Sequence, residues 1–287
     1  PFSIQLSFLF NRLIFFTQTK DTVVFLYNEV FPFLKKINVM KLSFVIVEYH
    51  SVEDILACSS SIQENMEKTS YQFEIIVSSN SLYNSEKRKQ LLAVHSLCKW
   101  IFNAENGGFA YAMNQGLKVA TGDILVIMNP DVRLKSGIGE MVEYFAAHEK
   151  IGLIAPMIRN TLGDIQDSYR HFITPWRFLV RHLVRVIGQK KLKKYDNPVN
   201  MDWVCGAFMM MSRASYTFAK GLDDGYFLYC EDMDLCKRMW LGGYKVIYYP
   251  MAEIEYEGTR SARYSLKYAL VFLKSLLRYW RKFGCIG

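Results

Sequence analysis

Hydrophobic positions in the first half of the chain alternate between short continuous runs and helical spacing. Continuous runs rich in β-branched residues predict buried strands, and apolar residues three and four positions apart predict helices. Ser51 with Asp54 fits a capping box at the start of the first helix. The predicted order is strand 42–47, helix from 51, strand 73–77, helix 86–97, strand 100–102, helix 110–120 and strand 123–128. Such alternation implies parallel strands joined by right-handed crossovers, hence an α/β fold with a doubly wound, mostly parallel sheet.

The second half has a less regular pattern. It predicts a helix at 139–148, a strand at 151–155, short strands within 203–211 and 245–249, and a long closing helix from about Ser261. No proline-rich linker separates the halves, so we expect one continuous unit. Ligands of doubly wound sheets bind outside the carboxyl ends of the strands. The loops at Tyr49, Ser79, Gly107 and Asn129 fall there, which favours a nucleotide-type site in the first half and an acceptor-type site in the second.

Residues 1–39 show neither a repeat nor a clean helical period, although they are rich in Phe and Leu. We expect Met40 to be the natural start and the upstream segment to be an extension of the reading frame. The alternative is a short membrane-associating helix, interrupted by Asn11, Arg12 and Lys20. The segment lacks the small-residue cleavage pattern of a signal peptide.

The positive charge is concentrated in two segments. The chain of 287 residues has a formal net charge of +8. Segments 170–194 and 258–287 hold 15 of the 35 Lys and Arg residues and no acid, so 20 basic residues face 27 acidic ones elsewhere. The protein is therefore an acidic body, net −7, with two basic segments. A content of 51% hydrophobic residues excludes a disordered or collagen-like chain.

The six cysteines are scattered without a C-x-x-C pair. A disulfide framework or a structural zinc site would need closer, patterned spacing. We therefore expect reduced, mostly buried thiols of a cytoplasmic protein. The sequence contains no uninterrupted run of about 18 apolar residues, so it predicts no membrane span.

Asp131 is the first candidate for chemistry. It follows the predicted strand 123–128 in the sequence Asn129-Pro130-Asp131. The X-Pro bond keeps the chain extended, so that the carboxylate projects into the crevice. A lone carboxylate there suits Mg²⁺ or Mn²⁺, which completes its shell with phosphate oxygens and water and would neutralise a diphosphate leaving group. The alternative is an ordinary turn, for which these residue types are also typical.

Glu231 and Asp232 form a second acidic candidate at the predicted start of a helix. Acids in a first helical turn complement the helix dipole, which is the structural explanation. The functional explanation makes one of them a general base that takes the proton from an attacking hydroxyl. Spacing alone does not choose between them. Gly107 and Gly108 lie at another helix start, but no G-x-G-x-x-G or phosphate-loop lysine accompanies them, which argues against a dinucleotide or ATP site.

Eight motifs in this order resemble the family 2 glycosyltransferases of the GT-A fold, and in particular the bacterial rhamnosyltransferase-like enzymes. The resemblance covers roughly residues 41–283. The motifs are Val45-Ile46-Val47-x-Tyr49, the loop after Ile75-Ile76-Val77, Glu105-Asn106-x-Gly108-Phe109-Ala110, Asn114-x-Gly116, Thr121-Gly122-Asp123, Asn129-Pro130-Asp131, Trp203-x-x-Gly206-Ala207-Phe208 and Phe227-x-x-x-Glu231-Asp232-x-Asp234-Leu235.

The resemblance implies an inverting, nucleotide-sugar-dependent transfer. By this analogy Asp131 binds the divalent metal, Asp232 is the catalytic base, and Glu231 orients the site or binds the acceptor. The same analogy assigns nucleotide-sugar binding to Tyr49, Asn80, Gly108, Asn114, Asn129 and Asp131, and assigns the acceptor side to Trp203 and Phe208, for which core packing is an equal alternative.

Three positions depart from the family pattern. Ser79 stands where the family usually has Asp, Tyr256 lies where a metal-binding His is frequent, and Glu48 replaces a more usual Asn or Thr. Glu255 or Glu257 is a candidate replacement for the missing metal ligand.

Basic residues in both segments are interleaved with apolar ones. Arg177, Arg181 and Arg185 recur every four residues, and the closing helix mixes Lys267, Lys274, Arg278 and Arg281 with Tyr268, Leu270, Leu273 and Trp280. This pattern is typical of helices that lie on an anionic membrane surface. A solvated helix face packed on the core is the alternative, and the acidic body argues against nucleic acid.

The expected organisation is an N-terminal extension (1–39), a GT-A domain (40–260) and a basic amphipathic helix (261–287). The GT-A domain divides into a nucleotide-sugar half (about 41–131) and an acceptor half (about 132–260). The expected enzyme transfers a sugar, with rhamnose from a dTDP donor as the specific candidate, to a surface-polysaccharide or lipid-linked glycan acceptor. It would work at the cytoplasmic face of a bacterial plasma membrane. A nucleotidyltransferase and a catalytically degenerate membrane-bound assembly partner are the rival hypotheses.

Overall fold

The structure is a computed structural model that describes residues 40–180, 194–258 and 265–284. Lys41–Gly287 form one compact unit. The N-terminal extension predicted for 1–39 lies outside the described residues. So do five cations of the first basic segment, namely Arg181, Arg185, Lys190, Lys191 and Lys193.

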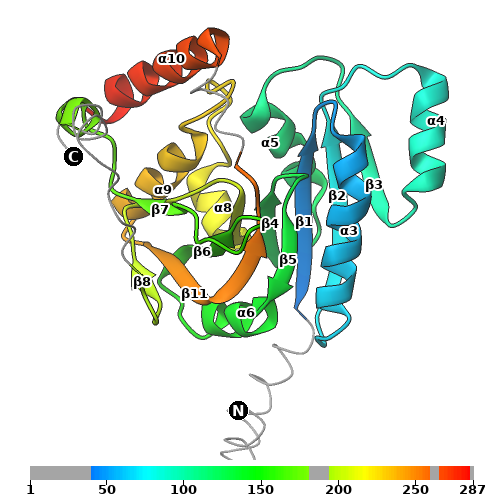
Figure 1. The fold of residues 1–287 in the computed structure, drawn as a ribbon, viewed down its shortest axis with the longest axis horizontal. Coiled ribbons are helices and arrows are strands. Elements are labelled where there is room, and N and C mark those ends of the chain that lie inside the picture. Colours follow the sequence, from blue (N-terminus) through cyan, green and yellow to red (C-terminus); the bar gives the residue numbers. More distant parts are fainter. Residues whose placement is uncertain (1–39, 181–193, 259–264, 285–287) are drawn as a thin grey trace, which may run out of the picture. The chain divides into compact units, whose positions relative to one another are not determined.

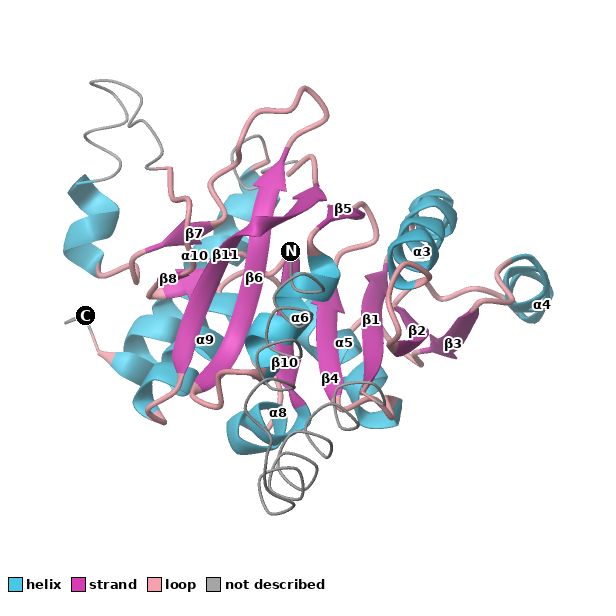
Figure 2. Cartoon of the chain, turned by 90° about the horizontal axis from the view of Figure 1, so that it is seen from below, coloured by secondary structure: helices cyan, strands magenta, loops and turns pink. Residues whose placement is uncertain are grey.

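The large sheet has the expected doubly wound core (Figures 1 and 2). Its strand order is β3-β2-β1-β4-β10-β6-β11-β5. The first four strands are parallel to one another. Their bounds are β1 (Lys41–Glu48), β2 (Gln72–Ser79), β3 (Cys98–Phe102) and β4 (Ile124–Met128). The prediction of a mostly parallel α/β sheet is confirmed.

The second half extends this sheet with strands of mixed direction. β10 (Phe208–Ser212) runs antiparallel between β4 and β6 (Ile151–Arg159), and β11 (Lys245–Glu255) is parallel to β6. β5 (Arg133–Ser136) and β8 (Val199–Asn200) pair antiparallel with β11. β7 (Tyr169–Arg170) and β9 (Trp203–Val204) form a separate two-stranded sheet.

Helices cover both faces of the large sheet, which is why its central strands are mostly apolar. α5 (Phe109–Val119), α8 (Arg213–Ala219) and α9 (Glu231–Leu241) share one buried cluster with Val45 and Val47 of β1. The alternate residues Phe44 and Ile46 are also buried and therefore face the opposite side. On the remaining elements, α3 (Val52–Met66) packs on β2 and β5, α6 (Ile138–Ala146) on β6 and β11, and α4 (Ser85–Val94) on β3.

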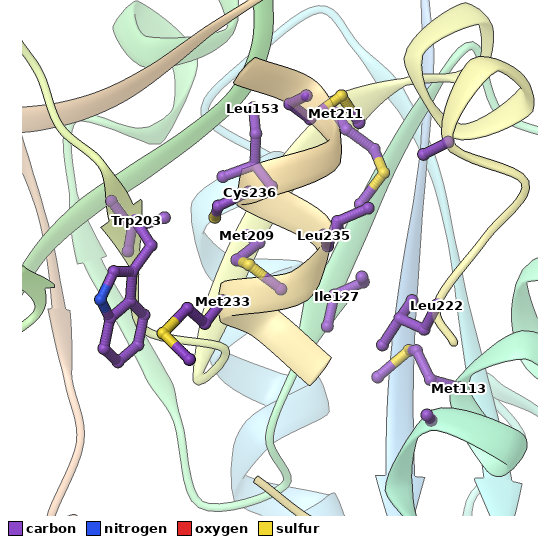
Figure 3. Close-up of a cluster of buried hydrophobic side chains, with 14 of the residues drawn as sticks. Met113, Ile127, Leu153, Trp203, Met209, Met211, Leu222, Met233, Leu235 and Cys236 are labelled. Carbon is purple, nitrogen blue, oxygen red and sulfur yellow. The ribbon is translucent and has the colours of Figure 1, made fainter. Parts of the chain in front are cut away.

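α9 lies over the part of the core shown in Figure 3. Its side chains Met233, Leu235 and Cys236 share one buried cluster with Met209 and Met211 of β10, and Met233 lies beside Trp203. All six side chains are buried. The helix that begins with Glu231 is thus held by its apolar face, which leaves its first turn at the edge of the sheet.

The structure corrects several local predictions. Ser51 is the N-cap of α3, but its side chain makes no capping hydrogen bond. Instead its backbone N–H donates to Glu48 Oε1 (3.0 Å). β11 continues to Glu255 past an irregularity between Tyr249 and Glu253, where Pro250 is tolerated. The closing helix is α10 (Leu266–Phe283), so it begins later than the predicted Ser261.

β5 has no counterpart among the predicted strands. Only Leu134 of its four residues is buried, so the segment carries no alternating apolar pattern. An edge strand of this length is defined by its partner, here β11, and not by its own hydrophobicity.

Two findings concern the described ranges alone. The five cysteines at 58, 98, 205, 230 and 236 are free thiols, and four of them are buried. No helix found there combines the length and the apolar character needed to cross a bilayer.

Candidate active site

The carboxyl ends of the parallel strands form one edge, and three other segments join it. β10 runs antiparallel to β4 with Phe208 opposite Met128, so the preceding loop reaches the same edge. There the Asn129 N–H donates to the Ala207 carbonyl (3.0 Å). Tyr256 follows β11, and its hydroxyl accepts a hydrogen bond from Asn129 Nδ2 (3.2 Å). The edge therefore brings together residues far apart in the sequence.

Glu48 is the centre of a buried hydrogen-bond network at the ends of β1 and β2. Its side chain is fully buried. Glu48 Oε2 accepts from Ser79 Oγ (2.5 Å), and Oε1 accepts from Ser81 Oγ (3.1 Å), Tyr83 Oη (3.0 Å) and the Ser51 N–H (3.0 Å). One carboxylate thus joins the loop after β1 to the loop after β2.

The Glu48 network explains two departures from the family pattern together. Glu48 and Ser79 are direct partners in the register of β1 and β2. The family usually has an Asp carboxylate at the position of Ser79 on β2. Here the Glu48 carboxylate lies directly beside that position, on β1. Tyr49, the next residue, is 51% exposed, and its ring lies 4.4 Å from that of His50. Tyr49 thus presents an accessible aromatic ring at this edge, and its contact with a nucleotide stays a prediction.

Asn80 and Gly108 connect the loops after β2 and β3. The Asn80 side chain is buried; its Nδ2 donates to the Gly108 carbonyl (3.0 Å), and its Oδ1 accepts from Asn103 Nδ2 (2.9 Å). Gly108 has φ +91°, and a Cβ there would lie 2.3 Å from the Phe227 carbonyl oxygen. Both residues hold the backbone of the predicted nucleotide site, and direct contact with a nucleotide stays a prediction.

Three other predicted site residues have structural partners. Asn114 binds the Leu222 backbone through Nδ2 (2.8 Å) and Oδ1 (3.0 Å), and Nδ2 also donates to Asp224. Trp203 and Phe208 are buried in the core, and Trp203 Nε1 donates to the His171 carbonyl (3.0 Å). Core packing, the alternative for the two aromatic residues, accounts for both positions.

Asp131 is a desolvated carboxyl at the end of β4. Burial raises its pKa to about 6, Asp54 adds to the rise, and Arg133 opposes it. The Arg133 guanidinium has other partners, since it donates to the Pro130 carbonyl (2.9 Å) and pairs with Asp54 (3.3 Å). The negative charge of Asp131 is therefore only partly compensated within the chain.

Asp232 and Glu231 differ in their hydrogen bonds. Asp232 Oδ2 accepts from the Gly206 N–H (3.0 Å), and Oδ1 accepts from the Met233 N–H (2.7 Å). Glu231 is 7% exposed, and its Oε2 has no hydrogen-bond partner among the described residues. Burial raises the pKa of both carboxyls. The Gly206 and Met233 N–H donors oppose the rise for Asp232, whereas the charges of Asp232 and Asp234 add to the rise for Glu231 and only its own N–H opposes it. The surroundings therefore favour Asp232 as the ionised member of the pair.

The two acidic candidates lie at the same end of the sheet. Burial raises the pKa of the Tyr256 hydroxyl, and the charges of Asp131 and Cys205 add to the rise. The charge of Asp232 in turn raises the pKa of Cys205. The Asn129 N–H bond to Ala207 and the Gly206 N–H bond to Asp232 join the two acidic candidates through neighbouring residues of one loop. The sequence marked Tyr256 only as a departure from a frequent metal-binding His, and that departure was the available signal for this position.

The residues fit a metal that takes few protein ligands. The described ranges contain no cluster of three or more His, Cys, Asp or Glu side chains able to hold an ion. Glu255 pairs with Lys135 (3.0 Å), and Glu257 accepts from Thr161 (3.1 Å), so the hypothesis that either replaces the missing ligand gains no support. The desolvated, partly compensated Asp131 suits Mg²⁺ or Mn²⁺ completed by phosphate oxygens and water.

Solved structures with a similar arrangement of elements identify the class of fold. One is GalNAc-T7 with UDP, GalNAc and Mn²⁺, with a TM-score of 0.58, 15% identity, and coverage of 76% of this chain and 43% of that one. Another is the mannosyltransferase PcManGT from Pyrobaculum calidifontis with GDP-Man and Mn²⁺, with a TM-score of 0.55, 15% identity, and coverage of 84% and 64%. These likenesses show the GT-A fold.

The sequence matches the model of Glycosyl transferase family 2 over residues 43–217, more than half of the chain. The protein belongs to this family and is a nucleotide-sugar-dependent glycosyltransferase. Rhamnosyltransferase WbbL of Escherichia coli (strain K12) is 25% identical over an alignment of 253 residues, which covers 82% of this chain and 91% of WbbL. The N-acetylglucosaminyl-diphospho-decaprenol L-rhamnosyltransferase of Mycobacterium tuberculosis (strain ATCC 25618 / H37Rv) is 26% identical over an alignment of 150 residues, which covers 46% of each chain. Neither rival hypothesis is favoured by these relatives.

Proposed function

We propose that the protein transfers rhamnose from a dTDP donor to a lipid-linked glycan with inversion at the anomeric carbon. One observation carries the mechanism: Asp232 is a half-buried carboxyl whose two oxygens accept backbone N–H bonds from Gly206 and Met233. The identity of the sugar is supported by the rhamnosyltransferases among the relatives.

Asp131 and Asn129 form the diphosphate side of the proposed site. A Mg²⁺ or Mn²⁺ ion held by Asp131 would supply positive charge for the departing diphosphate. Asn129 is positioned by its N–H bond to Ala207 and by the Tyr256 hydroxyl. Glu48 orders the loops that carry Tyr49 and Asn80, which we propose contact the nucleotide.

Asp232 acts as the general base in this proposal. The acceptor hydroxyl oxygen attacks the anomeric carbon, and its proton moves to an Asp232 carboxylate oxygen. The bond from the anomeric carbon to the diphosphate oxygen breaks, and its electron pair leaves with the diphosphate. A single in-line displacement of this kind inverts the anomeric configuration. Glu231, protonated through burial, orients the site without competing for the proton.

The acceptor in this proposal is a glycan carried on a polyprenyl diphosphate. The Mycobacterium tuberculosis relative is named for such a carrier. An acceptor of this kind lies at a membrane surface, so the enzyme would work as a peripheral protein at the cytoplasmic face of a bacterial plasma membrane.

The test is a panel of nucleotide sugars offered with Mn²⁺ and a synthetic polyprenyl-diphosphate-linked N-acetylglucosamine. We expect transfer and nucleoside diphosphate release with dTDP-rhamnose, and loss of both in Asp131→Ala. Asp232→Asn should abolish transfer while nucleotide binding, measured by calorimetry, persists. Asp196→Asn is the matched control, because Asp196 is exposed and has no proposed role. Full transfer by Asp232→Asn would refute the assignment of the base.

A further inference from the structure

α10 has two different faces, and only one of them packs on the protein. Ser275, Leu276 and Tyr279 are buried against the body. Ser275 Oγ donates to the Leu228 carbonyl (2.8 Å), so this face holds the loop that leads into Glu231. The sequence pattern mixed apolar and basic residues of the helix together, and the structure separates them.

The outward face of α10 carries a stripe of leucines. Leu266, Leu270, Leu273 and Leu277 are 42% to 78% exposed. Their spacing of four, three and four residues places them on one side of the helix. Contiguous exposed apolar surface of this kind marks an interaction site.

A second apolar surface lies on the neighbouring helical segment 175–180. The Phe178 ring lies 6.4 Å from Phe272 and 6.0 Å from Trp280, so the segment lies beside α10, as Figure 1 also shows. Its residues Trp176 and Leu179 are 71% and 50% exposed. Six large apolar side chains from two adjacent helices therefore lack cover by the described residues.

The cations of α10 fall into two groups. Arg278 pairs with Asp223 (2.7 Å), and Lys282 bridges Asp223 (2.8 Å) and the buried Asp234 (2.7 Å). Lys267, Lys274 and Arg281 make no ion pair with any part of the chain that the structure describes. They recur every seven residues, which forms a row beside the leucine stripe. The helix contains no acidic residue.

We infer that the leucine stripe of α10, together with Trp176 and Leu179, docks on a bilayer that contains anionic lipid. Leucines would enter the boundary between headgroups and acyl chains, and the basic row would meet the lipid phosphates. Charge argues against a second copy of this chain as the occupant. Packing this face on itself would bring two basic rows together without a compensating acid.

Docking through α10 would also place the acceptor side of the catalytic edge at the membrane. The helix is bound to the loop 223–230 through Arg278, Lys282 and Ser275, and that loop continues directly into Glu231 and Asp232. The purpose of the docking rests on the proposed lipid-linked acceptor, whereas the argument for the surface does not.

The test measures binding of the full chain to phosphatidylcholine vesicles with and without 30% phosphatidylglycerol. We expect binding that requires the anionic lipid and weakens at high salt. Leu270→Ser with Leu273→Ser should reduce it by at least tenfold, and Lys267→Gln with Lys274→Gln by about thirtyfold. The matched controls are Leu162→Ser, at an 85% exposed leucine far from α10 in the sequence, and Lys68→Gln with Lys118→Gln at exposed lysines.

Three outcomes would overturn the inference. One is vesicle binding unchanged in both double variants while circular dichroism shows them folded. Another is no binding of the wild type to anionic vesicles at low salt. The third is a dimer in solution by light scattering that the leucine variant converts to a monomer, since the face would then join two copies. Transfer measured without vesicles on a detergent-dispersed acceptor tests the proposed function separately, because α10 docking does not contribute to it.

Discussion

Removing the Glu48 carboxylate should destabilise the protein substantially, because four donors depend on it. Glu48→Ala takes the acceptor away from Ser79, Ser81, Tyr83 and the Ser51 N–H. Ser51 and Tyr83 are half-buried, so their donors can bond to water instead, but Ser79 and Ser81 are buried. An unpaired buried donor costs about 1–3 kcal/mol, so the two serines together predict a loss of about 2–6 kcal/mol. This is a large share of the roughly 5–15 kcal/mol that stabilises a typical domain.

The assay is urea unfolding followed by circular dichroism, with the slope of the transition compared between variants. Glu48→Gln should lose less, because its carbonyl oxygen still accepts and a serine hydroxyl can accept from its amide. Glu253→Ala is the control: Glu253 forms a half-exposed pair with Arg159 (2.7 Å), and such pairs contribute about 0–1 kcal/mol. A Glu48→Ala protein within 1 kcal/mol of the wild type would refute the reasoning.

Two further predictions concern Gly108 and Glu231. Gly108→Ala should lower the free energy of unfolding by more than about 2 kcal/mol, since strain at φ +91° adds to a clash with the Phe227 carbonyl. The control is Gly163→Ala, at φ +85° with open space around it, which should lower it by about 1 kcal/mol. Equal losses of the two variants in urea unfolding would contradict the role of the contact. Burial raises the pKa of Glu231 to about 8 from 4.5, so the folded state holds a proton that the unfolded state has lost, and stability falls as pH rises through this window. Glu231→Gln should remove that loss, so its melting temperature relative to the wild type should be higher at pH 8.5 than at pH 5, and a pH-independent difference would count against it.

Much of the fold was predictable because it depends on local pattern. The parallel strands β1, β2 and β4 each contain a buried apolar run, namely 44–47, 75–77 and 124–128. β5 was missed because one buried residue, Leu134, carries no period. The capping box at Ser51 was wrong because Glu48 competes for its backbone N–H.

The candidate site was predictable in part. The order of motifs identified the family and pointed to Asp131, Asp232 and Glu231, but their roles in catalysis stay predictions. The sequence treated Glu48 and Ser79 as two separate departures. Only the register of β1 against β2 showed them to be hydrogen-bonded partners. The two residues are 31 positions apart in the sequence, and strand pairing alone makes them neighbours.

The sequence by itself determined the class of fold, the family and the acidic residues available for chemistry, since each depends on the kind and order of residues along the chain. Tertiary structure alone decided which charges are paired. Arg278 and Lys282 belong to the body, through Asp223 and Asp234, whereas Lys267, Lys274 and Arg281 lie along an exposed leucine stripe. Both groups share one helix and one pattern of spacing. Their difference arises because packing buries one face of α10 and leaves the other without a protein partner among the described residues.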